Sequence, residues 1–241
     1  MTSGRSERRP RTAAELMAEL EQDSGYQTFV EEVKQEKQLR QEDDQRAAEP
    51  VLAELAGAGF PVDTIGELRQ RGVDYRRAVP ILLHWLPTMS DRSVKLDIIH
   101  ALGSKWARPA AARPLAEEFL RTVPDHDPPG DSVRWAIGDA LEVVADESVL
   151  DELLGLATDR QHGSERGFVV VALGNMARMR ERVVPVLLDL LDDDDVAGYA
   201  VMALGKLQVQ EARPAVERFL EHPASWVRKE AKKALSKIGP G

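Results

Sequence analysis

The stretch Val169-Val170-Val171-Ala172-Leu173-Gly174 decides the fold, because shorter forms of it return along the chain. An Ala-Leu pair recurs in steps of 39, 32, 31 and 31 residues, with its alanine at Ala101, Ala140, Ala172, Ala203 and Ala234. A near-constant period of this length indicates stacked repeats, in which one structural unit recurs and buries its apolar face against its neighbours. The pattern therefore predicts one continuous solenoid.

Each Ala-Leu pair closes a segment with the spacing of an amphipathic helix. Apolar residues precede the alanine by three and seven positions in most copies, as Ile98 and Val94 precede Ala101. This spacing places them on one helical face. A glycine follows the leucine in three copies and can end a helix by adopting φ > 0. We expect helices that end near Gly103, Gly174 and Gly205, with Leu102, Leu141, Leu173, Leu204 and Leu235 buried.

A second apolar segment follows each of these helices, for example Val184-Pro185-Val186-Leu187-Leu188. Proline is tolerated in the first turn of a helix, where its missing N–H would have no partner. We therefore expect second helices to begin near Pro80, Pro114, Pro185 and Pro214. Each repeat is then a pair of helices, and the predicted fold class is all-α, an α–α superhelix.

The first 60 residues differ from the repeats. Residues 1–12 contain several arginines and no apolar run of signal-peptide length, so we expect a disordered basic tail. Residues 13–60 predict charged helices, with exposed pairs such as Glu36 and Arg40. A solenoid needs polar caps, so these helices are expected to cap the repeat solenoid of residues 61–241.

The amino-acid composition disfavours several classes of binding partner. The 241 residues carry a formal net charge of −9 and no cysteine. The negative charge disfavours direct binding to nucleic acid and attraction to anionic membranes. The absence of cysteine excludes disulfides and thiolate ligands. No stretch approaches the length of a membrane span. We expect a cytoplasmic protein without membrane or direct nucleic-acid contact.

The repeated pattern Asp-x-x-Val-(Lys/Arg)-x-x-Ile-x-x-Ala-Leu-Gly, followed by Ala-Arg-Pro and an apolar helix, resembles the HEAT repeat. It is similar above all to the short bacterial type named after phycobilin lyases. Asp91 to Lys95 and Trp226 to Arg228 match well, whereas Ser164 to Arg166 and Val196-Ala197 depart from the pattern. The resemblance covers residues 75–238. It implies a right-handed superhelix whose second helices line the concave face.

Residues suited to catalysis are scattered. No phosphate-binding glycine loop and no His-Glu-x-x-His motif is present. Asp125-His126-Asp127 reads as a polar turn, although these residue types can hold a metal. Trp135 and Asp139 lie one helical turn apart, an aromatic–carboxylate pair of the kind that HEAT-like DNA glycosylases use. The simpler interpretation is that Trp135 packs between repeats. We expect no metal, no cofactor and no catalytic residue.

The second helices carry the stronger functional signal. Counted from each proline, or from Ser148 where proline is missing, positions +3, +4 and +7 fall opposite the apolar face. These positions and the adjoining turns are mostly carboxylates: Glu117, Glu118, Asp151, Glu152, Asp189, Asp192, Glu217, Arg218 and Glu221. Aligned across repeats, they form either a docking ridge for a basic surface or a solvated face.

The hypothesis that follows is a non-enzymatic interaction protein, either an adaptor or an inhibitor. It would bind another protein, expected to be basic, on an acidic concave face lined by these second helices. The alternative is a HEAT-like repeat enzyme of the bilin-lyase or DNA-glycosylase type. The sequence predicts neither the identity of the partner nor the oligomeric state.

Overall fold

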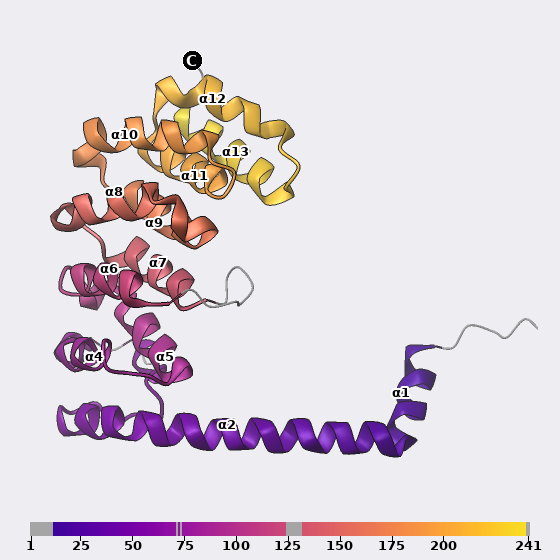
Figure 1. Cartoon of the computed structure of the whole chain (residues 1–241). Coiled ribbons are helices and arrows are strands. Elements are labelled where there is room, and N and C mark those ends of the chain that lie inside the picture. The colour runs from indigo at the N-terminus through magenta and orange to yellow at the C-terminus, as the bar shows by residue number, and fades with distance from the viewer. Residues whose placement is uncertain (1–11, 71, 73, 124–131, 240–241) are drawn as a thin grey trace, which may run out of the picture. The chain divides into compact units, whose positions relative to one another are not determined.

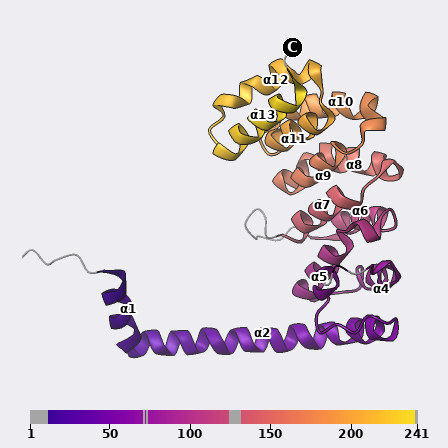
Figure 2. The ribbon, with the colours of Figure 1, turned by 180° about the vertical axis from the view of Figure 1, so that it is seen from behind.

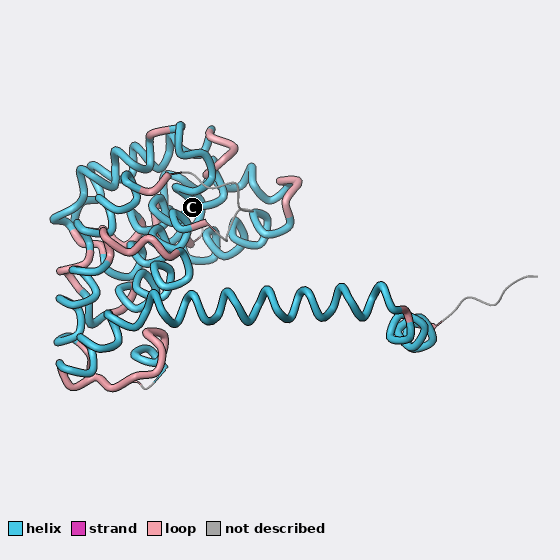
Figure 3. The backbone as a smooth tube through the Cα atoms, turned by 60° about the horizontal axis from the view of Figure 1, so that its bottom comes forward, coloured by secondary structure: helices cyan, strands magenta, loops and turns pink. Residues whose placement is uncertain are grey.

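The computed structural model describes residues 12–70, 72, 74–123 and 132–239. Most of the expected basic tail and the Asp125-His126-Asp127 segment lie outside these residues. Every regular element in the described ranges is helical, and none is a strand (Figure 3). None of the described helices combines the length and the apolar character that crossing a membrane requires. The chain divides into two compact units, residues 1–47 and 48–241, which are described separately.

The described part of the first unit consists of α1 (Ala13–Gln22) and the greater part of α2 (Ser24–Gly57). The Asp23 carboxylate between them accepts a hydrogen bond from the Tyr26 N–H at 2.9 Å, which supports the start of α2. The expected Glu36–Arg40 pair is present at 2.6 Å and is exposed. Such pairs add only a few tenths of a kcal/mol, about 0.3–0.5 each.

The second unit begins with the last turns of α2, where Val51 and Leu55 are fully buried. The indole N–H of Trp85 donates to the Glu54 carboxylate at 2.8 Å, which joins this end of α2 to the first repeat. The short helix α3 (Glu67–Gln70) follows. This end of α2 therefore belongs to the apolar core of the second unit.

Ten helices then alternate between two rows (Figure 1). The inner row consists of the helices with the Ala-Leu pairs: α5 (Arg92–Leu102), α7 (Val133–Val144), α9 (Gly167–Leu173), α11 (Ala197–Leu207) and α13 (Ser225–Ile238). The outer row consists of α4 (Val79–Trp85), α6 (Ala112–Arg121), α8 (Leu150–Thr158), α10 (Arg180–Asp189) and α12 (Arg213–Glu217), with the 3-10 turns η6 (Leu190–Asp192) and η8 (Arg218–Glu221).

The inner helices approach one another at their glycines. A Cβ atom added to Gly205 would lie 2.7 Å from the Cα of Ala234, and one on Gly174 would lie 2.8 Å from the Cα of Ala203. Gly103 faces Ala140 in the same way, at 3.1 Å. The glycine thus admits the backbone of the next repeat. The prediction that these glycines end the helices with a positive φ is wrong, because φ is −71° at Gly103 and −64° at Gly174.

The outer helices are spaced more widely than the inner ones. Successive inner helices are in extensive contact, whereas among the outer helices the contact between α8 and α10 is only slight and the other neighbours touch still less. A stack with one tight row bends toward that row, and both views show α12 on the outside of the bend and α13 on the inside (Figures 1 and 2). The resemblance implies that the second helices line the concave side. The structure contradicts this expectation, because the second helices form the outer row.

The ends of individual helices confirm some expectations and correct others. Leu102, Leu141, Leu173 and Leu204 are buried as expected, whereas Leu235, on α13, is half-buried. Proline opens α4 and α12, at Pro80 and Pro214. Pro185, in contrast, lies inside α10, which begins five residues earlier at Arg180. α11 also continues past Gly205 to Leu207.

The basic residue of the repeated pattern ties three of the inner helices, α7, α9 and α13, to the end of the outer helix before each. Arg134 donates to the Phe119 carbonyl at 3.2 Å, and Arg166 donates to the Ala157 carbonyl at 2.8 Å. Arg228 reaches the His222 carbonyl at 2.6 Å. The last carbonyls of a helix lack partners within the helix, so these arginines satisfy them and fix the turn.

Candidate functional site

The structure places most of the predicted partner-binding residues on the surface of the outer row. Glu117 is exposed on α6, Asp151 on α8 and Asp189 on α10. Glu152 is half-buried beside Asp151. The remaining exposed members lie on or next to the 3-10 turns that continue α10 and α12: Asp192, Glu217, Arg218 and Glu221.

Glu118 does not lie on this surface, so the prediction that its side chain points outward is wrong. Its side chain is 2% exposed and receives the Lys95 ammonium at 2.6 Å and the Arg121 guanidinium at 3.0 Å. Glu118 lies three residues after the buried Leu115, and this spacing puts both residues on the buried face of α6. Its carboxylate is therefore part of the packing within one repeat.

Arginines of neighbouring repeats pair with several of the exposed carboxylates. Arg113 on α6 binds Glu152 on α8, and Arg182 on α10 binds Asp151 on α8. Arg218 lies 3.3 Å from Asp192, while Glu217 is held at 3.0 Å by Arg213 of its own helix. The outer row is therefore a ladder of ion pairs rather than a continuous ridge of like charges. Exposed pairs of this kind contribute about 0–1 kcal/mol each.

Three of the predicted partner-binding carboxylates remain outside this ladder. Glu117, Asp189 and Glu221 make no ion pair with any residue that the structure describes. They lie on α6, at the end of α10 and in η8, so the excess negative charge recurs along the row. Fewer carboxylates are therefore available to a cationic partner than the sequence suggests, and these three residues are the ones without an ion pair.

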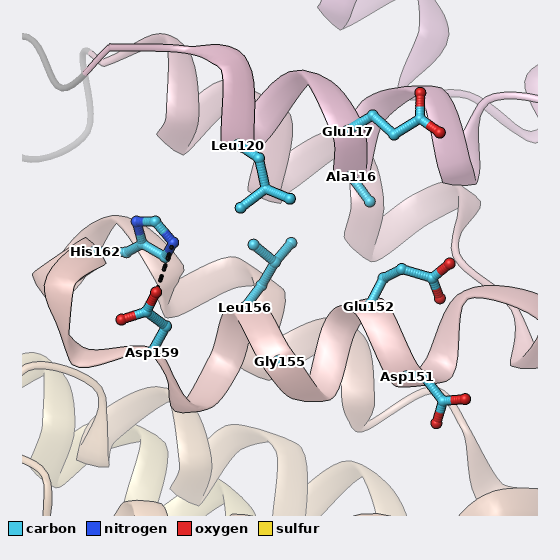
Figure 4. Close-up of a pocket in the computed structure, with 9 residues that line it drawn as sticks. All are labelled: Ala116, Glu117, Leu120, Asp151, Glu152, Gly155, Leu156, Asp159 and His162. Atoms are coloured by element: carbon cyan, nitrogen blue, oxygen red, sulfur yellow. Dashed lines mark ion pairs between the residues drawn. The ribbon is translucent and has the colours of Figure 1, made fainter.

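A groove of about 370 Å³ opens between α6 and α8 (Figure 4). Ala116 and Leu120 line it from α6, and Gly155 and Leu156 line it from α8. The side chains of Leu120 and Leu156 point toward each other across it. Glu117, Asp151 and Glu152 stand at one end, and Asp159 and His162 stand at the other. The groove therefore combines an apolar middle with acidic ends.

His162 closes one end of this groove in an uncharged form. Burial, followed by the nearby positive charge of Arg134, lowers the pKa of His162 from its ordinary value. Its Nδ1 lies 3.3 Å from the Arg134 Nη1, and its ring meets Phe119 edge-on. Nε2 lies 3.4 Å from the Asp159 carboxylate without making a hydrogen bond. The imidazole is thus part of the wall of the groove.

An aromatic row runs along the inner helices, a feature missed in reading the sequence. Neighbouring rings of Trp135, Phe168, Tyr199 and Trp226 lie 5.1, 5.9 and 5.1 Å apart, centroid to centroid. Each residue lies four to eight positions before the alanine of its repeat, and this recurrence is the signal that could have revealed the row. Trp135 packs between repeats as expected, and Asp139 one turn later is exposed.

The described residues show no cluster of three or more histidine, aspartate and glutamate side chains that could hold a metal ion. The most deeply buried ion pair among the described residues has a structural role. Arg166 is fully buried and binds Asp193 at 2.7 Å. Burial alone would raise the pKa of Asp193, but the hydrogen bond and charge of Arg166 outweigh burial and lower it. Asp193 therefore anchors the turn before α11 and is not part of the acidic surface.

Comparison with known proteins agrees with this architecture. A profile of HEAT repeats matches residues 192–240, which contain α11, α12 and α13. No curated protein matches the chain. The helix pairs before residue 192 continue the same stack, with the same glycine-on-alanine contacts between inner helices. The chain is a HEAT-like repeat protein, folded as an all-α superhelix.

Proposed function

We propose that the chain is a non-enzymatic adaptor or inhibitor that binds a basic partner protein through its outer row. HEAT repeats generally mediate protein–protein interaction, and a solenoid offers a long surface that needs little rearrangement on binding. The observation that carries the proposal is the recurrence of exposed carboxylates without an ion pair, at Glu117, Asp189 and Glu221. The proposal keeps the cytoplasmic setting expected from the sequence.

The charge pattern supports a cationic partner rather than a neutral one. Paired carboxylates such as Asp192 already have a guanidinium beside them, and they add little field at a distance. The three unpaired carboxylates have no described guanidinium or ammonium group within ion-pair distance to offset them. A basic surface that approaches them is attracted within a Debye length of about 8–10 Å, and this attraction speeds association more than it strengthens binding.

The proposal includes no catalytic step and no cofactor. A glycosylase would need Trp135 free to contact a nucleoside, yet its ring packs edge-on against Phe168 and Tyr199. An acidic chain also gains no affinity for DNA from counterion release. Protein binding is therefore favoured over the glycosylase alternative.

The test begins with affinity purification of the chain from its native host and identification of the bound protein by mass spectrometry. The affinity of that protein is then measured for two variants with the same change in charge. The outer-row variant carries Glu117→Lys, Asp189→Lys and Glu221→Lys. The α2 control carries Glu32→Lys, Glu42→Lys and Glu49→Lys, all at exposed positions of α2. We expect binding to weaken at least about tenfold in the outer-row variant only. Equal affinity of the two variants, or an acidic partner, would overturn the proposal.

A further inference from the structure

We infer that the groove between α6 and α8 is the seat of an amphipathic helical segment of the basic partner. The segment would place an apolar side chain between Leu120 and Leu156, and Lys or Arg side chains beside the carboxylates at the ends of the groove. This inference rests on the proposed function and names the part of the outer row that does most of the recognition. It adds an apolar anchor to a surface so far described by its charge alone.

The middle of the groove offers apolar surface that the fold leaves uncovered. Leu120 is 61% exposed although it lies on a helix whose other large apolar residues are buried. Gly155 on the facing helix has no side chain to cover it, and a Cβ added there would touch nothing within 4 Å. Burying a leucine against a partner is favourable by about 25 cal/mol per Å² of apolar surface removed from water. Leu120 is therefore the natural anchor point.

The lining of the groove explains why the occupant is basic. All four ionised groups of the lining are carboxylates: Glu117, Asp151, Glu152 and Asp159. His162 is neutral because burial and Arg134 lower its pKa. Glu117 has no ion pair with a described residue, and a carboxylate that already binds one arginine can still accept a further donor. An acidic segment would meet repulsion from Glu117 at one end and from Asp159 at the other, whereas a basic one would be neutralised there.

The shape of the groove suits side chains that come from one face of a helix. Its walls are two neighbouring helices, and its volume of about 370 Å³ admits side chains but not a whole extra helix. Helices that bind in grooves use apolar anchors at positions i, i+3 or i+4, and i+7, with polar residues between them. An anchor flanked by Lys or Arg one turn away on each side would match Leu120 at the centre and carboxylates at the two ends.

The inference can be tested on the full chain before the native partner is known. The probe is a synthetic 14-residue peptide of Leu and Lys, arranged so that all Leu residues lie on one helical face. Its matched control has Glu in place of each Lys. Binding is measured by fluorescence anisotropy with wild type, Leu120→Gln and Gly155→Leu, a change that fills the groove without altering charge. Leu39→Gln is the control for an exposed leucine outside the groove.

We expect the Lys peptide to bind wild type and the Leu39→Gln variant equally, and to bind Leu120→Gln and Gly155→Leu at least about tenfold more weakly. The Glu peptide should not bind. Circular dichroism checks that both groove variants keep wild-type helicity. Undiminished binding to both groove variants, or equal binding of the two peptides, would overturn the inference.

The native partner separates this inference from the proposed function. Loss of the partner in both the outer-row variant and the Leu120→Gln variant supports both statements. If the outer-row variant loses the partner while Leu120→Gln and Gly155→Leu retain it, the acidic surface binds the partner but the groove is not its seat. If no variant loses the partner, both the inference and the proposed function fail.

Discussion

At the scale of single residues, the glycines after the Ala-Leu pairs allow the inner helices to pack closely because they have no side chain. Gly103, Gly174 and Gly205 each lie against an alanine of the next inner helix, where a methyl group would overlap the backbone. Gly155 on α8 is the opposite case, because a methyl group there would meet open space. The two environments predict opposite effects of one substitution.

Gly205→Ala should destabilise the protein by about 1–3 kcal/mol, because the added methyl would lie 2.7 Å from both Cα and Cβ of Ala234 and must push the two helices apart. Gly155→Ala should stabilise it by about 0.4–1 kcal/mol, since alanine restricts the unfolded chain and fits the helix. Urea denaturation of both variants measures the difference. A Gly205→Ala variant as stable as wild type would show that the inner helices are not packed backbone to backbone.

His162 predicts how stability depends on pH. Its pKa is lowered in the folded protein, so the unfolded chain binds more protons below about pH 6.5, the ordinary value for histidine. Stability from this group is complete above that pH and is lost as the pH falls toward the folded pKa. The His162→Gln variant should therefore lose less stability than wild type between about pH 7 and pH 5. His84→Gln, at an exposed ring, is the control. Identical pH profiles for wild type and His162→Gln would contradict the prediction.

At the scale of helices, buried and exposed ion pairs join the repeats at different depths. Arg166 holds Asp193 and two backbone carbonyls, of Ala157 and Gly163, and is fully buried. Arg182 holds Asp151 on the surface of the outer row. The buried pair fixes a turn between repeats, whereas the exposed pair only joins the surfaces of neighbouring outer helices.

Arg166→Ala should cost about 3–5 kcal/mol, because it leaves the Asp193 carboxylate buried with only the exposed Arg160 beside it. Arg182→Ala should cost less than about 1 kcal/mol, because water replaces the guanidinium beside the exposed Asp151. Chemical denaturation of the two variants compares the losses directly. Losses of similar size would mean that the Arg166 cluster is not the anchor of its turn.

The sequence predicts the buried face of each helix better than it predicts the side-chain contacts between repeats. Spacing within one helix places Val94 and Ile98 on one face whatever the neighbours do, and both are buried. Pairing between repeats depends on how far apart the helices stand, and this distance is set by contacts such as Gly205 on Ala234. The pairing of Arg182 with Asp151 and the groove beside Leu120 therefore appear only in three dimensions.

At the scale of the whole molecule, the second unit extends N-terminally to Ala48, into the last turns of α2. Val51 and Leu55 have no exposed surface there and cover the first repeat. A fragment of residues 48–241 should remain folded and monodisperse, whereas a fragment of residues 61–241 should expose this apolar surface and aggregate. Size-exclusion chromatography with thermal melting tests both fragments. A well-behaved fragment 61–241 would show that this end of α2 is dispensable.

The central claim is that unpaired carboxylates of the outer row steer a basic partner, and the salt dependence of association tests it most directly. The association rate constant of the native partner is measured from low to physiological ionic strength for wild type, the outer-row variant and the α2 control. Steering predicts a rate that falls steeply with salt for wild type and the α2 control, and a nearly flat dependence for the outer-row variant. An outer-row variant with the same salt dependence as wild type would contradict the claim.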